Sequence, residues 1–224
     1  MCRFRRTEPA ASGFNRKIAE RTAILALDMQ PLPHFLMWLV SLRSAETQTT
    51  LRERTALANI ARGRSRIVEI GVWHGVTTSV LRRAMSPDGL LWAVDPFPAG
   101  RLFVNLQQPI ARREVGRVLN GAVRWVRESG QQAASTYRRA GEPPADLIFI
   151  DGDHSYEGLT DDWKAWSPLV RPGGAVALHD SRSTPERRID DAGSVRATAE
   201  IVLNDPDFEL SEEVDSLTVV RRRS

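Results

Sequence analysis

From residue 66 onward, short apolar runs alternate with amphipathic stretches. Five apolar runs are typical of buried strands: RIVEIGV (66–72), LLWAVDP (90–96), AVRWVRE (122–128), ADLIFID (145–151) and GAVALHD (174–180). The stretches between and after them predict helices: TTSVLRRAM (77–85), residues 110–120, QQAASTYRRAG, residues 156–170 and SVRATAEIVL. Strands that alternate with helices predict a mostly parallel, Rossmann-like sheet with helices on both faces.

The two ends of the chain depart from this alternation. FELSEEV and LTVVRRR, separated by Asp215 and Ser216, predict a closing hairpin. PHFLMWLVSL and LRERTALANIARG predict two helices upstream of the first strand. We therefore expect an N-terminal arm and helical cap at residues 1–63 and one α/β domain at residues 64–224.

Composition narrows the class of protein. The 224 residues carry a formal net charge of +3, and nearly all the cations are arginines that are scattered along the chain. Scattered arginines favour solvated faces over a nucleic-acid strip, so a nucleic-acid methyltransferase or binder is the weaker alternative. Cys2 is the only cysteine, which excludes a disulfide framework. No apolar run reaches the roughly 18 residues of a membrane helix, and we expect a cytoplasmic protein.

In parallel sheets, ligands lie beyond the carboxyl ends of the strands, so these ends carry the candidate chemistry. EIGVWHGVTT (69–78) supplies a glycine turn with Gly71 and Gly75. Asp95 ends the next strand, at the spacing where an acid accepts both hydroxyls of a ribose. Because the G-x-G-x-x-G pyrophosphate cradle is missing, the pattern favours a nucleoside without pyrophosphate and speaks against an NAD oxidoreductase.

Acidic residues and histidines gather at the two later strand ends. Asp151, Asp153 and His154 follow one strand, and His179 and Asp180 follow the next. Converging carboxylates repel one another unless they share a cation or a proton, which suggests Mg²⁺ or Mn²⁺. Taken singly, Asp153 could instead cap a helix, His154 could pack and Asp180 could cap a loop.

EIGVWHGVTT, AVDPF and DLIFIDGDHSYEGLTDDWKAWSPLVRPGGAVALHDS together resemble the class I S-adenosylmethionine-dependent methyltransferases. The closer resemblance is to the methyltransferase-24 type, and a more distant one is to the macrocin and aminocoumarin sugar O-methyltransferases. It covers about residues 64–223. It implies a seven-stranded sheet whose antiparallel last strand is inserted between its neighbours, with S-adenosylmethionine over the first strand ends.

The resemblance also assigns residues. For the cofactor it implies Glu69, Gly71, Val72, Gly75, Asp95, Ser129, Gly130, Gln131 and Asp151. For the metal it implies Asp151 and Asp180, with His179 standing where the sugar enzymes carry an acid. Asp153 transfers as the candidate base. Trp73, His74, Tyr156 and Trp163 are candidate walls of the acceptor pocket, although the tryptophans fit core packing equally well.

Methyl transfer needs an acceptor oxygen aligned with the sulfonium methyl group, and a base for its proton. A bound Mg²⁺ or Mn²⁺ would lower the pKa of the acceptor hydroxyl. Both Asp153 and His154 could take the proton, with a slight preference for Asp153. We therefore predict a metal-dependent O-methyltransferase for a small hydroxylated molecule, such as a sugar or secondary metabolite. A metal-independent enzyme with His154 as base is the alternative, and a homo-oligomer stays open.

Overall fold

The computed structural model describes residues 31–99 and 104–224, and its centre is one seven-stranded sheet of order β3-β2-β1-β4-β5-β7-β6. The strands are β1 (Arg66–Ile70), β2 (Leu90–Val94), β3 (Ala122–Val126), β4 (Ala145–Ile150), β5 (Val170–Leu178), β6 (Phe208–Val214) and β7 (Leu217–Arg222). The first five are parallel, and β7 pairs antiparallel with both β5 and β6. This arrangement confirms the predicted Rossmann-like fold with an inserted antiparallel last strand.

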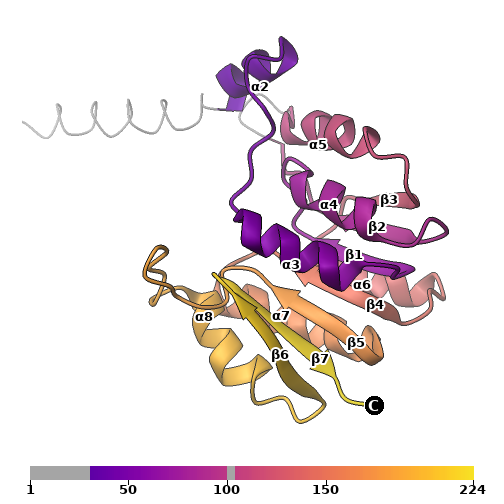
Figure 1. The fold of residues 1–224 in the computed structure, drawn as a ribbon, viewed down its shortest axis with the longest axis vertical. Coiled ribbons are helices and arrows are strands. Elements are labelled where there is room, and N and C mark those ends of the chain that lie inside the picture. The colour runs from indigo at the N-terminus through magenta and orange to yellow at the C-terminus, as the bar shows by residue number, and fades with distance from the viewer. Residues whose placement is uncertain (1–30, 100–103) are drawn as a thin grey trace, which may run out of the picture.

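Helices cover both faces of this sheet (Figure 1). They are α2 (Pro31–Leu39), α3 (Leu51–Ala61), α4 (Val76–Ala84), α5 (Gln107–Gly116), α6 (Gly130–Arg139), α7 (Tyr156–Trp166) and α8 (Gly193–Ala197). Two short helical turns follow α7 and α8: a 3₁₀ turn η1 (Ser167–Leu169) and a π-helical turn η2 (Thr198–Val202). The predicted helix at 156–170 therefore ends earlier, at Trp166, where the chain tightens before Pro168.

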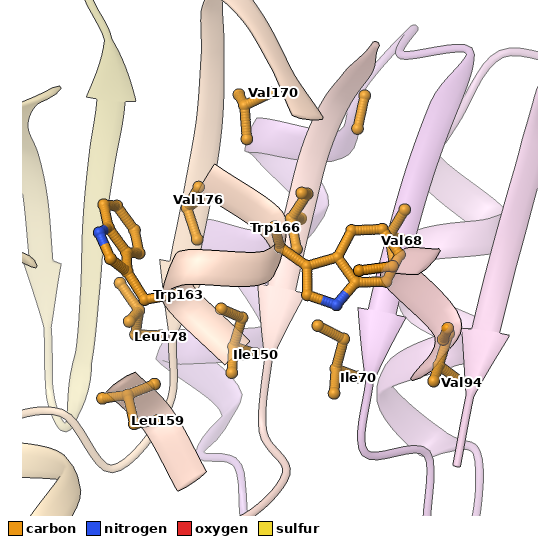
Figure 2. Packing of buried hydrophobic residues seen from close by; sticks show 14 of the residues in the cluster. Val68, Ile70, Val94, Ile150, Leu159, Trp163, Trp166, Val170, Val176 and Leu178 are labelled. Carbon is orange, nitrogen blue, oxygen red and sulfur yellow. The ribbon is translucent and has the colours of Figure 1, made fainter. Parts of the chain in front are cut away.

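The strands of this sheet are apolar on both faces, as two-sided burial requires. Val68 and Ile70 belong to one buried cluster, together with side chains of α6 and α7. Ile67, which precedes Val68 in sequence, belongs to the other cluster with α3 and α4. Figure 2 shows Trp163 and Trp166 of α7 lying over β-strand residues of the first cluster. Trp163 is thus a core residue, which overturns its interpretation as an acceptor wall.

The N-terminal segment reaches the domain through α3. Thr50 and Glu53 form a capping box at the start of α3, and Leu57 is fully buried against the sheet cluster. Helix α2 lies apart, beside α5 (Figure 1). Residues 1–30 of the predicted arm lie outside the described residues. Within the described part of the chain, no helix combines the length and apolarity needed to cross a membrane.

Candidate active site

The hydrogen bonds between neighbouring parallel strands continue one residue beyond the ends of β1, β2, β4 and β5. They place the candidate residues at the same edge of the sheet. The amide of Asp151 donates to the carbonyl of Ile70 at 2.8 Å, and the amide of His179 donates to Ile150 at 3.0 Å. The amides of Gly71 and Asp95 extend the ladder in the same way, toward β2 and β3. The candidate residues that follow a strand directly are Gly71, Asp95, Asp151 and His179.

A cavity of about 460 Å³ opens along this edge. Eight of the predicted site residues line it: Gly71, Val72, Asp95, Ser129, Gln131, Asp151, Asp153 and His154. Gly130, also named for the cofactor, lines it as well. The predicted Glu69, Gly75, His179 and Asp180 do not line it.

The turn after β1 requires glycine at position 71. Gly71 has φ +89°, and a Cβ atom there would overlap the carbonyl oxygen of Asp151. Trp73 also adopts a positive φ of +49°, and its ring lines the cavity. The close approach of this turn to the end of β4 therefore depends on a residue without a side chain.

Asp95 stabilises the same turn. Its Oδ2 accepts hydrogen bonds from the amides of Val72 (3.0 Å) and Trp73 (2.9 Å), and its Oδ1 accepts one from Phe97 (2.7 Å). A carboxylate offers about four acceptor sites, so one remains for a hydroxyl of a ligand. Asp95 is 9% exposed and lines the cavity.

The opposite wall comes from the start of α6. Ser129 is the N-cap of this helix, and the indole of Trp166 donates to the carbonyl of Gly130 at 2.9 Å. The side-chain amide of Gln131 donates to Asp162 Oδ1 at 2.9 Å, and Asp162 also lines the cavity. Burial raises the pKa of Asp162 to about 7, and the neighbouring Asp153 and Asp161 add to the shift.

Two predicted cofactor residues lie behind the cavity surface. Glu69 is fully buried, and burial raises the pKa of its carboxyl group well above the usual range. Gly75 is the N-cap of α4 with φ +74°, and a Cβ there would press on Ala111 of α5 at 3.0 Å. Neither residue lines the cavity.

His179 connects two acidic side chains. Its Nδ1 lies 2.9 Å from Asp151 Oδ1, and its Nε2 lies 3.4 Å from Glu53 Oε2. Burial alone would lower the pKa of His179, but the acceptors Asp151 and Glu53 outweigh it and raise the pKa to about 10. Burial acts to raise the pKa of Glu53, and His179 with hydrogen bonds from Thr50 and Ser216 lowers it to about 2. The raised pKa favours the protonated form of the buried His179 ring, which lies between two carboxylates.

Asp180 also has a cation beside it. Its Oδ2 lies 2.5 Å from Arg187 Nη2, and its Oδ1 lies 3.2 Å from the hydroxyl of Ser216. Asp180 is thus paired with Arg187, and His179 lies between Asp151 and Glu53; the binding of Mg²⁺ or Mn²⁺ by Asp151, His179 and Asp180 stays a prediction. In this arrangement Asp151 shares His179 with Glu53, and Asp180 pairs with Arg187.

The two candidate bases differ in their contacts. Asp153 Oδ1 accepts the amide of Ser155 at 2.8 Å, and its side chain packs against Gly158, so it stabilises the start of α7. His154 is 41% exposed at its side chain, and its Nε2 lies 3.7 Å from Asp151 Oδ1 and 3.9 Å from Asp180 Oδ2. Asp153 is thus engaged by the start of its own helix, whereas the partly exposed ring of His154 lies near two carboxylates.

Several residues of the site carry no strand-end motif. Glu53 supplies a buried charge and Arg187 a partly exposed one, Asp162 supports Gln131, and Thr47 and Gln48 line the cavity from the segment before α3. Asp162 left one signal in the sequence, because the helical period of α7 places it on the side of the buried Leu159 and Trp166.

The order and direction of the seven strands are those of the class I S-adenosylmethionine-dependent methyltransferase fold. A family model for the methyltransferase domain, of the methyltransferase-24 type, matches residues 68–181, just over half of the chain. The chain belongs to this family. Sequence comparison with curated proteins found no match.

Solved structures show the same fold. The O-methyltransferase TomG from Streptomyces achromogenes, in complex with SAM, is 19% identical, with a TM-score of 0.61 over 87% of this chain and 90% of that one. The O-methyltransferase from Bacillus cereus, in complex with SAH, is 20% identical, with a TM-score of 0.59 over 86% and 90%. The N-methyltransferase NodS from Bradyrhizobium japonicum WM9 is 16% identical, with a TM-score of 0.54 over 77% and 95%. The fold is thus shared by enzymes that methylate oxygen and nitrogen.

Proposed function

We propose that this methyltransferase transfers the methyl group of S-adenosylmethionine to a hydroxyl group of a small molecule, with His154 as the general base and without a metal. The observation that carries the proposal is the cavity, which is lined by both Asp95 and His154. We call the part around Asp95 and the turn after β1 the cofactor end, and the part around Asp151 and His154 the β4 end. The O-methyltransferase neighbours and the sequence resemblance to macrocin-type sugar enzymes support a sugar or secondary-metabolite hydroxyl as acceptor.

The acidic side chains of the cavity favour the binding of a small cationic cofactor and oppose the binding of a nucleic-acid substrate. Acidic side chains contribute six of the lining residues: Glu46, Asp95, Glu128, Asp151, Asp153 and Asp162. Among the described residues, no arginine or lysine lines it. S-adenosylmethionine carries a sulfonium and an ammonium group, which an acidic cavity attracts, whereas it repels a phosphate backbone.

The proposed reaction follows from the position of His154. The acceptor oxygen attacks the methyl carbon, the carbon–sulfur bond breaks, and its electron pair stays on sulfur as S-adenosylhomocysteine forms. The imidazole of His154 takes the hydroxyl proton. Asp151 and Asp180, 3.7 and 3.9 Å from its Nε2, stabilise the imidazolium that results.

The formal charges near His154 favour this proton transfer. Three carboxylates, those of Glu53, Asp151 and Asp180, share two cations, His179 and Arg187. One negative charge is therefore left over beside His154, and a proton on its ring balances it. A metal ion would add a further cation at this place and oppose protonation of His154, which is why we prefer the metal-independent form.

The test is transfer of a labelled methyl group from S-adenosylmethionine to a panel of catechols and glycosides, with mass spectrometry to identify a methyl ether. We expect His154→Ala to reduce the rate about 10²–10⁴-fold with little change in S-adenosylhomocysteine affinity. Asp153→Asn is the matched control, and we expect its rate to fall less than about tenfold. A rate in His154→Ala close to that of wild type, or methylation confined to RNA or DNA, would contradict the proposal.

A further inference from the structure

A second cluster of ionisable side chains lies at the outer rim of the cavity, away from the strand ends. It is formed by His34 of α2, Glu46 of the segment between α2 and α3, and His74 of the turn after β1. Among residues 31–99 and 104–224, this is the one group of three or more histidine, cysteine or acidic residues whose ligand atoms all lie within 4.8 Å of one another. Two imidazoles and one carboxylate are ligands that divalent transition metals prefer.

The buried ring of His34 carries unused hydrogen-bonding capacity. His34 is 7% exposed, and neither of its ring nitrogens makes a hydrogen bond within the described part of the chain. Its Nδ1 lies only 3.0 Å from Glu46 Oε1, so the pair is close but not aligned as a hydrogen bond. A buried polar side chain without a partner is costly, which indicates that a ligand completes this site.

The ring of His74 also directs a nitrogen lone pair toward the segment that carries Glu46. The amide of Glu46 donates to His74 Nδ1 at 3.1 Å, which leaves this nitrogen without a proton. The rings of His34 and His74 stack at a centroid distance of 5.1 Å, and Trp73 stacks on the other side of His74 at 4.5 Å. The competing cation, Arg43, lies 3.7 Å from Glu46 in an exposed pair that contributes little to stability.

We propose that His34, Glu46 and His74 bind one divalent transition metal ion of the Zn²⁺ type, with the fourth position open to water. The ion replaces the amide contact at His74 Nδ1 and joins three segments that are far apart in sequence. Because Glu46 and Trp73 line the cavity, the bound ion holds the segment from α2 to α3 against the cavity rim. This site is separate from Asp151 and Asp180, so the proposal does not depend on the chemistry of methyl transfer.

The test is titration of the untagged, chelator-treated full chain with Co²⁺ as a spectroscopic probe, followed by displacement with Zn²⁺. A Cys2→Ser background removes the only thiol, which could bind the probe on its own. We expect one Co²⁺ per chain with visible absorption bands, displacement by Zn²⁺, and a higher melting temperature when the metal is bound. His34→Gln and Glu46→Gln should each weaken binding at least about 100-fold.

The control is His154→Gln, which removes the exposed histidine of the β4 end and should bind Co²⁺ as the wild type does. If His34→Gln does not fold, Glu46→Gln decides the question, because this side chain is 46% exposed and its loss leaves the core intact. No Co²⁺ binding by the wild type would overturn the proposal. Unchanged binding in Glu46→Gln, or binding lost in His154→Gln instead, would also overturn it and move the ion elsewhere.

Discussion

The two ends of the cavity are built by different interactions. At the cofactor end, main-chain amides of the turn after β1 donate hydrogen bonds to the carboxylate of Asp95, and Gly71 lies in close contact with the end of β4. At the β4 end, charged contacts hold the side chains: the buried His179 lies between Asp151 and Glu53, and the partly exposed Arg187 pairs with Asp180. Steric fit therefore controls the first end, and charge balance controls the second.

This contrast makes Gly71 the most sensitive position at the cofactor end. In Gly71→Ala the new methyl group would overlap the Asp151 carbonyl, and alanine would have to adopt the left-handed backbone conformation of position 71. We therefore expect the unfolding free energy to fall by about 3 kcal/mol or more. Binding of S-adenosylhomocysteine should be lost with it. Denaturant unfolding and calorimetry measure both effects.

Gly141→Ala is the matched control, because Gly141 has φ +66° but open space around the missing Cβ. It should lose only the cost of the left-handed conformation, about 1–2 kcal/mol, and keep its affinity for S-adenosylhomocysteine. Equal losses of stability and affinity in the two variants would show that contact with the end of β4 is unimportant.

At the β4 end, removing one buried charge should be the largest change. We expect Glu53→Ala to lower the unfolding free energy by about 3–5 kcal/mol, because it leaves the His179 cation without one of its two acids. Glu209→Ala removes an acid from the exposed pair with Arg223 and should cost less than about 1 kcal/mol. A loss in Glu53→Ala as small as in Glu209→Ala would contradict the charge-balance description.

The two ends should also differ in pH dependence. The pKa of His179 in the folded chain, about 10, lies above its ordinary value of 6.5. Its contribution is therefore complete below pH 6.5 and lost as the pH rises toward 10, with a slope of at most about 1.4 kcal/mol per pH unit. We expect the unfolding free energy of the wild type to fall over this range more steeply than that of His179→Gln. Parallel curves for the two proteins would show that His179 is not a buried cation.

The same contrast explains how far the sequence predicts the molecule. The sheet and the cofactor end follow from local patterns: an apolar strand, a glycine turn, and Asp95 one strand later. Alternation of strands and helices then predicts parallel strands, and the carboxyl ends of parallel strands lie at one edge, where Asp151 and His179 are found.

The charges of the β4 end could not be predicted in this way. Glu53 is part of a helix start whose pattern indicates only a capping box, yet it contacts Ser216, 163 positions away. Arg187 lies in an irregular segment with no periodic signal. The sequence predicted a metal ion among these carboxylates, which stays a prediction, and it did not predict that the basic side chains of His179 and Arg187 lie beside them.

The most direct test of the whole account is calorimetric titration of S-adenosylhomocysteine into the wild type, once with Mg²⁺ and once with a chelator. The account predicts one ligand per chain with the same dissociation constant in both conditions, and a much weaker affinity in Gly71→Ala. Absence of binding would contradict the assignment of the cavity, and binding that requires Mg²⁺ would contradict the metal-independent site.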